Sequence, residues 1–175
     1  NKQYKLAIGM RWEEWESKYN DSNNESFNPS NYMNGGKLSL IKNMNTKSNM
    51  YLSIARGYKQ GGFNLGLDAL DNSSNKNLIY DPEFLTNYEF GINSKFDNQD
   101  LNLSAVIFFS KRKDQQVLIS RQVDSADPNT FSYLTQNAAN GKNYGFEFNS
   151  NFLLRERILI YLNLGILKTE INNWE

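Results

Sequence analysis

The chain has 175 residues with 19 basic and 19 acidic side chains, and it contains neither histidine nor cysteine. The balanced charge argues against a nucleic-acid-binding protein, which carries a basic excess. The missing residue types exclude histidine-based serine triads, cysteine nucleophiles and the usual zinc sites. No run approaches the roughly 18 apolar residues of a membrane-spanning helix.

Period-two alternation of apolar and polar residues runs along most of the chain and predicts strands. In chain order, the alternating stretches cover residues 4–12, 38–43, 50–58, 87–96, 101–109, 143–152 and 158–166. These make about seven strands of roughly nine to thirteen residues, whereas the mean strand of a globular protein has about five or six. The sequence therefore predicts an all-β protein with unusually long strands.

The predicted connections alternate between short and long. Short turns fall at 45–49, 97–100 and 153–157, and long polar segments fall at 15–36, 59–85 and 119–141. All long segments then emerge at one end of the sheet, and loops of this length are uncommon in compact soluble domains. The pattern is typical of antiparallel up-and-down transmembrane β-barrels, which have short periplasmic turns and long outer loops.

Aromatic residues recur eight positions apart on one face of three predicted strands. The pairs are Tyr4 and Trp12, Tyr88 and Phe96, and Tyr144 and Phe152. Eight residues of a tilted strand climb roughly 20 Å along a barrel axis, close to the lipid-facing band of about 25 Å that aromatic girdles border. Strand propensity explains the number of aromatic residues but not this spacing. We therefore expect this face to meet lipid, with a soluble barrel or sandwich as the alternative.

The opposite face carries charged and amide side chains, which a dry core could not hold without partners. The residues expected to face a wet or polar-filled lumen are Arg11, Glu89, Asn93, Glu147 and Asn149, together with Lys5 and Asn163. About seven strands cannot close so wide a barrel. Residues 1–175 are therefore expected to be a partial β-barrel domain from a longer protein.

Three glycines cluster in the stretch "RGYKQGGFN", residues 56–64, whose spacing fits neither nucleotide-binding glycine pattern. Gly57, Gly61 and Gly62 fall where a strand is expected to bend into a loop, and glycine suits such a bend because it accepts positive φ. Strict alternation sends Arg56 outward, towards anionic headgroups. A bulge at Gly57 would instead turn Arg56 inward, and both orientations remain open.

Four stretches together resemble the β-barrel of TonB-dependent outer-membrane receptors, in the siderophore-receptor branch. They are "YLSIARGYKQGGFN" (51–64), "YDPEFLTNYEFGINSKF" (80–96), "LNLSAVIFFSKRKDQQV" (101–117) and "NAANGKNYGFEFNSNF" (137–152). The resemblance implies a barrel of about 22 strands plugged by an N-terminal domain, in the outer membrane of a Gram-negative bacterium. The implied partners are outer-membrane lipid and lipopolysaccharide, the TonB complex acting through a plug that this chain lacks, and a siderophore or other small ligand.

Ligand contacts are expected in the long loops and the upper lumen, where an extracellular solute first meets the protein. The candidates are Arg56, Tyr58, Phe63, Arg112, Arg121, Phe131 and Tyr133. Aromatic rings and arginines can hold an anionic ferric siderophore by stacking and charge. Rim packing and lipopolysaccharide contact are the alternative roles of these residues.

Two groups of acidic residues raise other chemistry. Glu89 and Glu147, expected about 10 Å apart, could suit an inverting glycosidase, but pairing with basic groups across the lumen is the favoured interpretation. A calcium site could form from the loop acids, although the EF-hand pattern is missing; these acids are Asp68, Asp71, Asp81 and Glu83. No catalytic residue, metal or cofactor is predicted.

The sequence is thus interpreted as part of a TonB-dependent receptor that binds and imports a scarce extracellular ligand, with a ferric siderophore preferred and no enzyme activity expected. The first alternative is a passive porin-like or structural outer-membrane barrel. The last-ranked alternative is a soluble β-barrel that binds a ligand or acts on carbohydrate.

Overall fold

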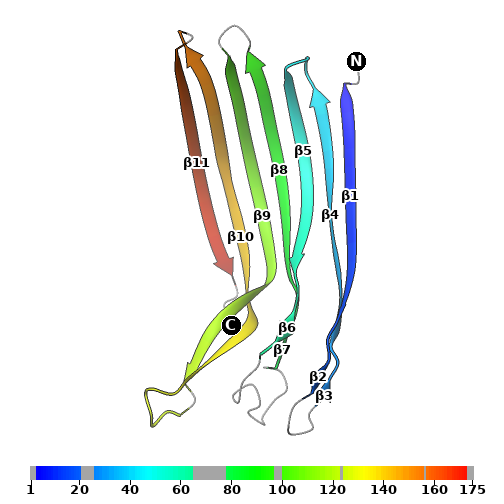
Figure 1. The fold of residues 1–175 in the computed structure, drawn as a ribbon, viewed down its shortest axis with the longest axis vertical. Coiled ribbons are helices and arrows are strands. Elements are labelled where there is room, and N and C mark those ends of the chain that lie inside the picture. Colours follow the sequence, from blue (N-terminus) through cyan, green and yellow to red (C-terminus); the bar gives the residue numbers. More distant parts are fainter. Residues whose placement is uncertain are drawn as a thin grey trace.

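Seven long strands form one antiparallel sheet in the computed structural model (Figure 1), which describes residues 3–20, 26–64, 78–96, 100–122, 124–155 and 157–172. The strands are β1 (Tyr4–Glu16), β4 (Ser30–Asn43), β5 (Ser48–Lys59), β8 (Glu83–Phe96), β9 (Leu101–Gln122), β10 (Phe131–Leu154) and β11 (Ile158–Asn172). Each pairs with the next in the order β1-β4-β5-β8-β9-β10-β11. This up-and-down sheet confirms the predicted fold class. It is open, because β1 and β11 each pair on one side only.

The connections divide between the two ends of the sheet, as predicted. Figure 1 shows the short turns together at one end and the long connections at the other. Two small hairpins extend the long-connection end, formed by β2 (Tyr19–Asn20) with β3 (Ser26–Phe27) and by β6 (Gly62–Phe63) with β7 (Ile79–Tyr80). The described part of the chain has no helix with the length and apolar character needed to span a membrane.

The strands are longer than the sequence predicted, and range from 12 residues in β5 to 24 in β10. The expected long loop at 119–141 is wrong, because β9 and β10 remain paired there, from Ile119 opposite Leu134 to Gln122 opposite Phe131. Beyond the apolar band a strand no longer needs one continuous apolar face, so this extension lacks the alternation that marks the other strands.

One face of the sheet is apolar from edge to edge. The strand register aligns a row formed by Leu6, Leu40, Leu52, Phe90, Ile107, Phe146 and Ile166. Five of the seven side chains in this row are exposed, from Leu40 at 43% to Ile166 at 62%, and Phe90 and Phe146 are partly buried. Soluble proteins rarely expose so continuous an apolar surface. Alternate residues that face lipid explain it, as in membrane barrels.

The opposite face is mixed, and facing glycines make room for its large rings. Tyr51 lies over Gly91, and Phe108 lies over Gly145, where a Cβ would overlap the ring. Between β4 and β5 the buried hydroxyls of Ser39 and Ser53 form a hydrogen bond of 3.1 Å. This face therefore combines polar groups with aromatic rings that pack onto the backbone of neighbouring strands.

The glycines of residues 56–64 act differently from the prediction. The main strand does end here, between Lys59 and Gly62, but none of Gly57, Gly61 and Gly62 has a φ in the left-handed region, so that part of the expectation is wrong. A Cβ on Gly61 or Gly62 would instead collide with Tyr80, the backbone oxygen in one case and the phenol in the other. These two glycines therefore permit the close approach of β6 and β7, whereas Gly57 faces open space.

The orientation of Arg56 follows from the same segment. The pairing of β5 with β8 continues without a shift from Arg56 through Gly57 to Lys59, so no bulge turns Arg56 inward. Arg56 keeps the outward register of Ile54, and its guanidinium carbon lies 4.5 Å from the centre of the Phe84 ring.

Candidate ligand-binding region at the long-connection end

The long connections converge in a small apolar cluster outside the main sheet. Leu78 and Leu134 are its buried centre, with exposed fractions of 2% and 3%, and Phe27, Phe63, Ile79 and Ile119 pack against them. The Phe63 ring also lies 6.2 Å from Trp15 and 5.6 Å from Tyr19, centre to centre. Segments from the β1–β4 and β5–β8 connections and from the paired β9–β10 extension therefore form one packed unit, which we call the loop cluster.

Asn64 fastens the β6–β7 hairpin to β10. Its side-chain nitrogen donates to the Thr135 carbonyl oxygen, and its side-chain oxygen accepts from the Thr135 N–H, both at 2.8 Å. The amide thus pairs with a strand backbone as another strand would. Asn64 is 8% exposed, so these hydrogen bonds are shielded from water, where their loss is most costly.

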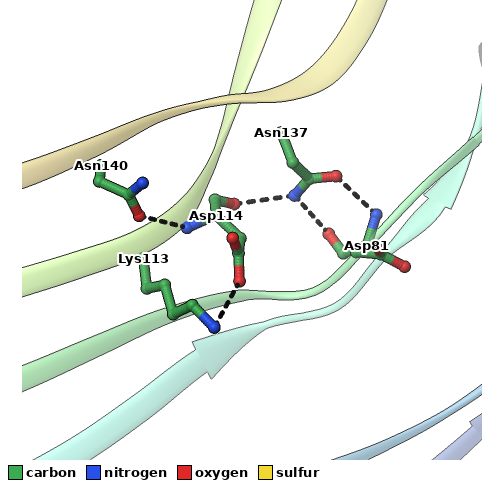
Figure 2. Close-up of polar contacts among 5 residues, drawn as sticks. All are labelled: Asp81, Lys113, Asp114, Asn137 and Asn140. Carbon is green, nitrogen blue, oxygen red and sulfur yellow. Dashed lines mark hydrogen bonds and ion pairs between the residues drawn. The ribbon is translucent and has the colours of Figure 1, made fainter. Parts of the chain in front are cut away.

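Asn137 joins three segments where the register of β9 and β10 shifts (Figure 2). Its oxygen accepts from the Asp81 N–H at 2.7 Å, and its nitrogen donates to the carbonyl oxygens of Asp81 at 2.9 Å and Asp114 at 2.8 Å. Asp114 has a φ of 55°, and its N–H donates to Asn140 at 3.3 Å. Side-chain amides thus satisfy backbone groups that the irregular ladder leaves unpaired.

Glu83 and Gln116 fix the start of β8 to β9. The Glu83 carboxylate lies 3.3 Å from Arg112 Nε and accepts from the Gln116 N–H at 3.0 Å. The Gln116 side chain donates to the carbonyl oxygens of Gln60 at 2.8 Å and Asp81 at 3.0 Å. Both ends of the β5–β8 connection are therefore held against the neighbouring hairpin.

A second polar group lies on β1 and β5, just below the loop cluster. Arg11 and Glu13 form a hydrogen-bonded ion pair, and the Tyr58 hydroxyl donates to Glu13 at 2.6 Å. The Arg11 guanidinium lies 5.7 Å from the centre of the Tyr58 ring. A Cβ at Gly35 would lie 3.0 Å from that ring, so this glycine makes room for it.

The predicted ligand contacts do not gather into one site. Arg56 lies on the outward face, whereas Arg112 lies on the opposite face and pairs with Glu83. Tyr58 is engaged with Glu13, and Phe63 packs within the loop cluster. Arg56 and Tyr58 both lie against the Phe84 ring, at 4.5 Å and 6.5 Å from its centre, whereas Phe63 and Arg112 lie elsewhere.

The remaining three candidates belong to the β9–β10 extension. Phe131 and Tyr133 are 52% and 66% exposed, and they lie on the same face of β10, two residues apart. Arg121 pairs through its backbone with Ser132, but its side chain lies outside the described residues. Both rings are therefore exposed to solvent, and a ligand-binding role for them stays a prediction.

The predicted lumen residues share the face opposite the apolar rows. Arg11 lies near the long connections, and Glu89 accepts from Asn87 at 2.6 Å. Asn93 and Asn149 line a polar pocket of about 270 Å³ towards the short turns, and Asn93 donates to Asn49 at 3.2 Å. Glu147 lies on β10, separated from Glu89 by β9.

The calcium hypothesis gains no geometric support from the part of the chain that the structure describes. There, no three acidic side chains come close enough to share a metal ion. Glu83 is engaged by Arg112, and Asp81 contributes backbone groups to Asn137. Asp68 and Asp71 lie outside the described residues.

Sequence reasoning missed the residues that organise this region, which are Asn64, Asn137 and Gln116. Each acts through a hydrogen bond to the backbone of a segment distant in sequence. Periodicity carries no information about such partners. The glycine-rich stretch that ends at Asn64 indicated an unusual segment, but it did not indicate that Asn64 hydrogen-bonds to Thr135 of β10.

The sheet is an open antiparallel wall with an apolar outer face. It has short turns at one end and long packed connections at the other, which is the architecture of an outer-membrane β-barrel. Residues 1–171 match the family model described as TonB dependent receptor-like, beta-barrel. The chain belongs to this family, and its place is the outer membrane of a Gram-negative bacterium.

Individual relatives agree with this assignment. The probable TonB-dependent siderophore receptor PiuA of Acinetobacter baumannii is 26% identical over 178 residues, which cover 95% of this chain and 22% of PiuA. The ferric yersiniabactin uptake receptor FyuA of Yersinia pestis has a TM-score of 0.72 at 18% identity, covering 99% of this chain and 25% of FyuA. The copper transporter OprC has a TM-score of 0.69 at 13% identity, and the match covers 99% of this chain and 28% of OprC. The chain thus spans about a quarter of the proteins that it resembles.

Proposed function

We propose that this chain forms part of a receptor that binds and imports a scarce extracellular ligand, with a ferric siderophore as the preferred substrate. The observation that carries the proposal is the loop cluster, in which apolar side chains pack the β1–β4 and β5–β8 connections against the β9–β10 extension, while Asn64, Asn137 and Gln116 join the β5–β8 connection to that extension. A passive pore does not require such a built surface. PiuA is named a siderophore receptor and FyuA a ferric yersiniabactin receptor, which favours this substrate class over others.

Binding would begin at the β9–β10 extension. Phe131 and Tyr133 present exposed rings that can stack on a planar or aromatic chelate. Positive charge for an anionic ferric complex would come from other parts of the receptor, because Arg112 is paired with Glu83 and Arg121 has the register of Ser132, on the face opposite these two rings. Import would then require the TonB complex, acting through a plug domain outside this chain. No step involves covalent chemistry.

The test is growth under iron restriction. A strain deleted for the full gene is supplied with single ferric siderophores and complemented with wild type, with the double variant Phe131→Ala/Tyr133→Ala, or with Tyr32→Ala. Tyr32 is a matched control, because it is 65% exposed but lies on the outward register of β4. We expect one siderophore to require the gene, and the double variant to need at least about tenfold more of it, for a loss of roughly 1.4 kcal/mol.

Two outcomes would contradict the proposal. In the first, growth depends on the gene for copper supply but for no ferric siderophore. The proposed substrate would then be copper, the substrate in the name of OprC. Uptake that persists when the proton gradient is collapsed would identify a passive pore.

A further inference from the structure

The sheet divides into two ribbons at its long-connection end. The ladder between β4 and β5 stops at the pair Gly36 and Arg56, just beyond the apolar rows. Past this fork β4 still pairs with β1 up to its first residue, Ser30, and β5 still pairs with β8 up to its last residue, Lys59. We call the outer part of the first ribbon the flap, which consists of residues 11–16 on β1 and 30–35 on β4.

Tyr58 reaches across the fork between the two ribbons. Its register matches that of Arg56, on the outward face of β5. Its hydroxyl nevertheless donates at 2.6 Å to Glu13, which lies on the lumen face of the flap. A Cβ at Gly35, on the same lumen face, would lie 3.0 Å from the Tyr58 ring. The flap therefore overlaps the outward side of the β5–β8 ribbon, and its inner face is covered, since Met33 there is only 2% exposed.

Among the residues that the structure describes, one side-chain hydrogen bond joins the flap to the β5–β8 ribbon. It is the bond from Tyr58 to Glu13, and apolar contacts add to it, such as that of Trp15 with Phe63, whose ring centres are 6.2 Å apart. The β5–β8 connection, by contrast, is fixed to β9 and β10 by three side-chain amides that bind backbone groups. The flap is therefore the part of this end that separates with the fewest hydrogen bonds lost.

We propose that the flap opens and closes as a unit about the fork, with Tyr58 as its latch, and that its opening creates a side entrance to the upper lumen. Gly36 places a small residue at the fork, as hinges often have. When Tyr58 leaves, Arg11 and Glu13 remain paired with each other, so release leaves no charge without a partner. The inner face around Met33 then loses its cover. The inference concerns access to the lumen and does not depend on which ligand is imported.

The experiment compares two buried positions on the same face of β4, one on each side of the fork. Met33 and Ser39 are 2% and 6% exposed, and each is replaced by cysteine in the full-length receptor after any other cysteine has been changed to serine. The receptor in lipid vesicles is labelled with a small maleimide and with one the size of a ferric siderophore. Tyr58→Phe should speed both reactions at residue 33 by about tenfold, because a hydrogen bond to a carboxylate is lost. Labelling at residue 39 should not change.

Tyr32→Phe is the matched control. Tyr32 also interacts with a carboxylate, but its partner Glu14 belongs to the flap itself, so labelling at residue 33 should not change. Unchanged labelling at residue 33 in Tyr58→Phe would overturn the proposal. Equal acceleration at residues 33 and 39 would also overturn it, because the whole sheet would then be loosened, and so would acceleration with the small maleimide alone.

Amide exchange provides a second measurement if a cysteine variant does not fold. In the receptor without introduced cysteines, Tyr58→Phe should accelerate exchange in residues 11–16 and 30–35 and leave residues 52–55 of β5 unchanged, because local opening exposes only the segment that separates. Acceleration of all three segments together would contradict a separately moving flap.

Discussion

Replacing Ile92 by lysine should destabilise the barrel far more than the same replacement of its neighbour Asn93. Ile92 lies on the outward face of β8, four residues from both Tyr88 and Phe96, which border the apolar band. At a rise of about 3.4 Å and a tilt of about 40°, it lies roughly 10 Å from either border. A lysine at that depth is expected to cost about 2–4 kcal/mol.

Asn93 is the matched control because it is adjacent but belongs to the opposite face. Its replacement loses one hydrogen bond to Asn49, at 3.2 Å, which is worth about 1 kcal/mol. Lysine can remain hydrated in a wet lumen, so no membrane penalty is added. Asn93→Ala measures the hydrogen-bond part separately.

The assay is urea unfolding of the full-length barrel refolded into lipid vesicles, followed by tryptophan fluorescence and gel mobility. A difference of about 2 kcal/mol between the free energies of unfolding of the two variants corresponds to roughly thirtyfold in the folding equilibrium constant. Such a difference is larger than the uncertainty of urea midpoints when the variants share the same denaturant slope. Equal losses at residues 92 and 93, or a larger loss at 93, would refute the assignment of faces.

Two further predictions concern packing. Asn64→Ala removes both hydrogen bonds to Thr135, so amide exchange in β6 and β7 should accelerate by about tenfold or more, and unchanged exchange would show that the amide does not hold the hairpin. Gly145→Ala would drive a methyl group into the Phe108 ring and the backbone of β11, and should cost about 1–3 kcal/mol in urea unfolding. Gly57→Ala, which meets open space, should cost less than 1 kcal/mol, and equal costs would contradict the predicted overlap.

The sheet could be predicted from the sequence because every second residue of a strand in a membrane barrel faces lipid and is apolar. Tyr88, Phe90 and Ile92 face lipid, so their period directly reports the strand and its face. The alternation of turn lengths then gives the strand order, since antiparallel neighbours joined by short turns must be adjacent. Both signals are local and repeat along the chain.

The long-connection end could not be predicted in the same way. The extension of β9 and β10 beyond Arg112 lacks alternation, and Asn64 and Asn137 replace missing backbone partners rather than forming a pattern. Gly61 and Gly62 were correctly marked as special, but for the wrong reason. Their need for glycine comes from Tyr80, eighteen or more residues later in the chain.

The central claim is that successive residues of each strand face lipid and lumen in turn, and a cysteine scan of β8 tests it most directly. These 175 residues contain no cysteine, so once any cysteine elsewhere in the full-length protein is replaced by serine, single cysteines at residues 88 to 93 can carry an environment-sensitive fluorophore in the vesicle-inserted barrel. The account predicts quenching by brominated lipid at 88, 90 and 92, and quenching by aqueous iodide at 89, 91 and 93. Quenching without a period of two, or with the two sets exchanged, would contradict it.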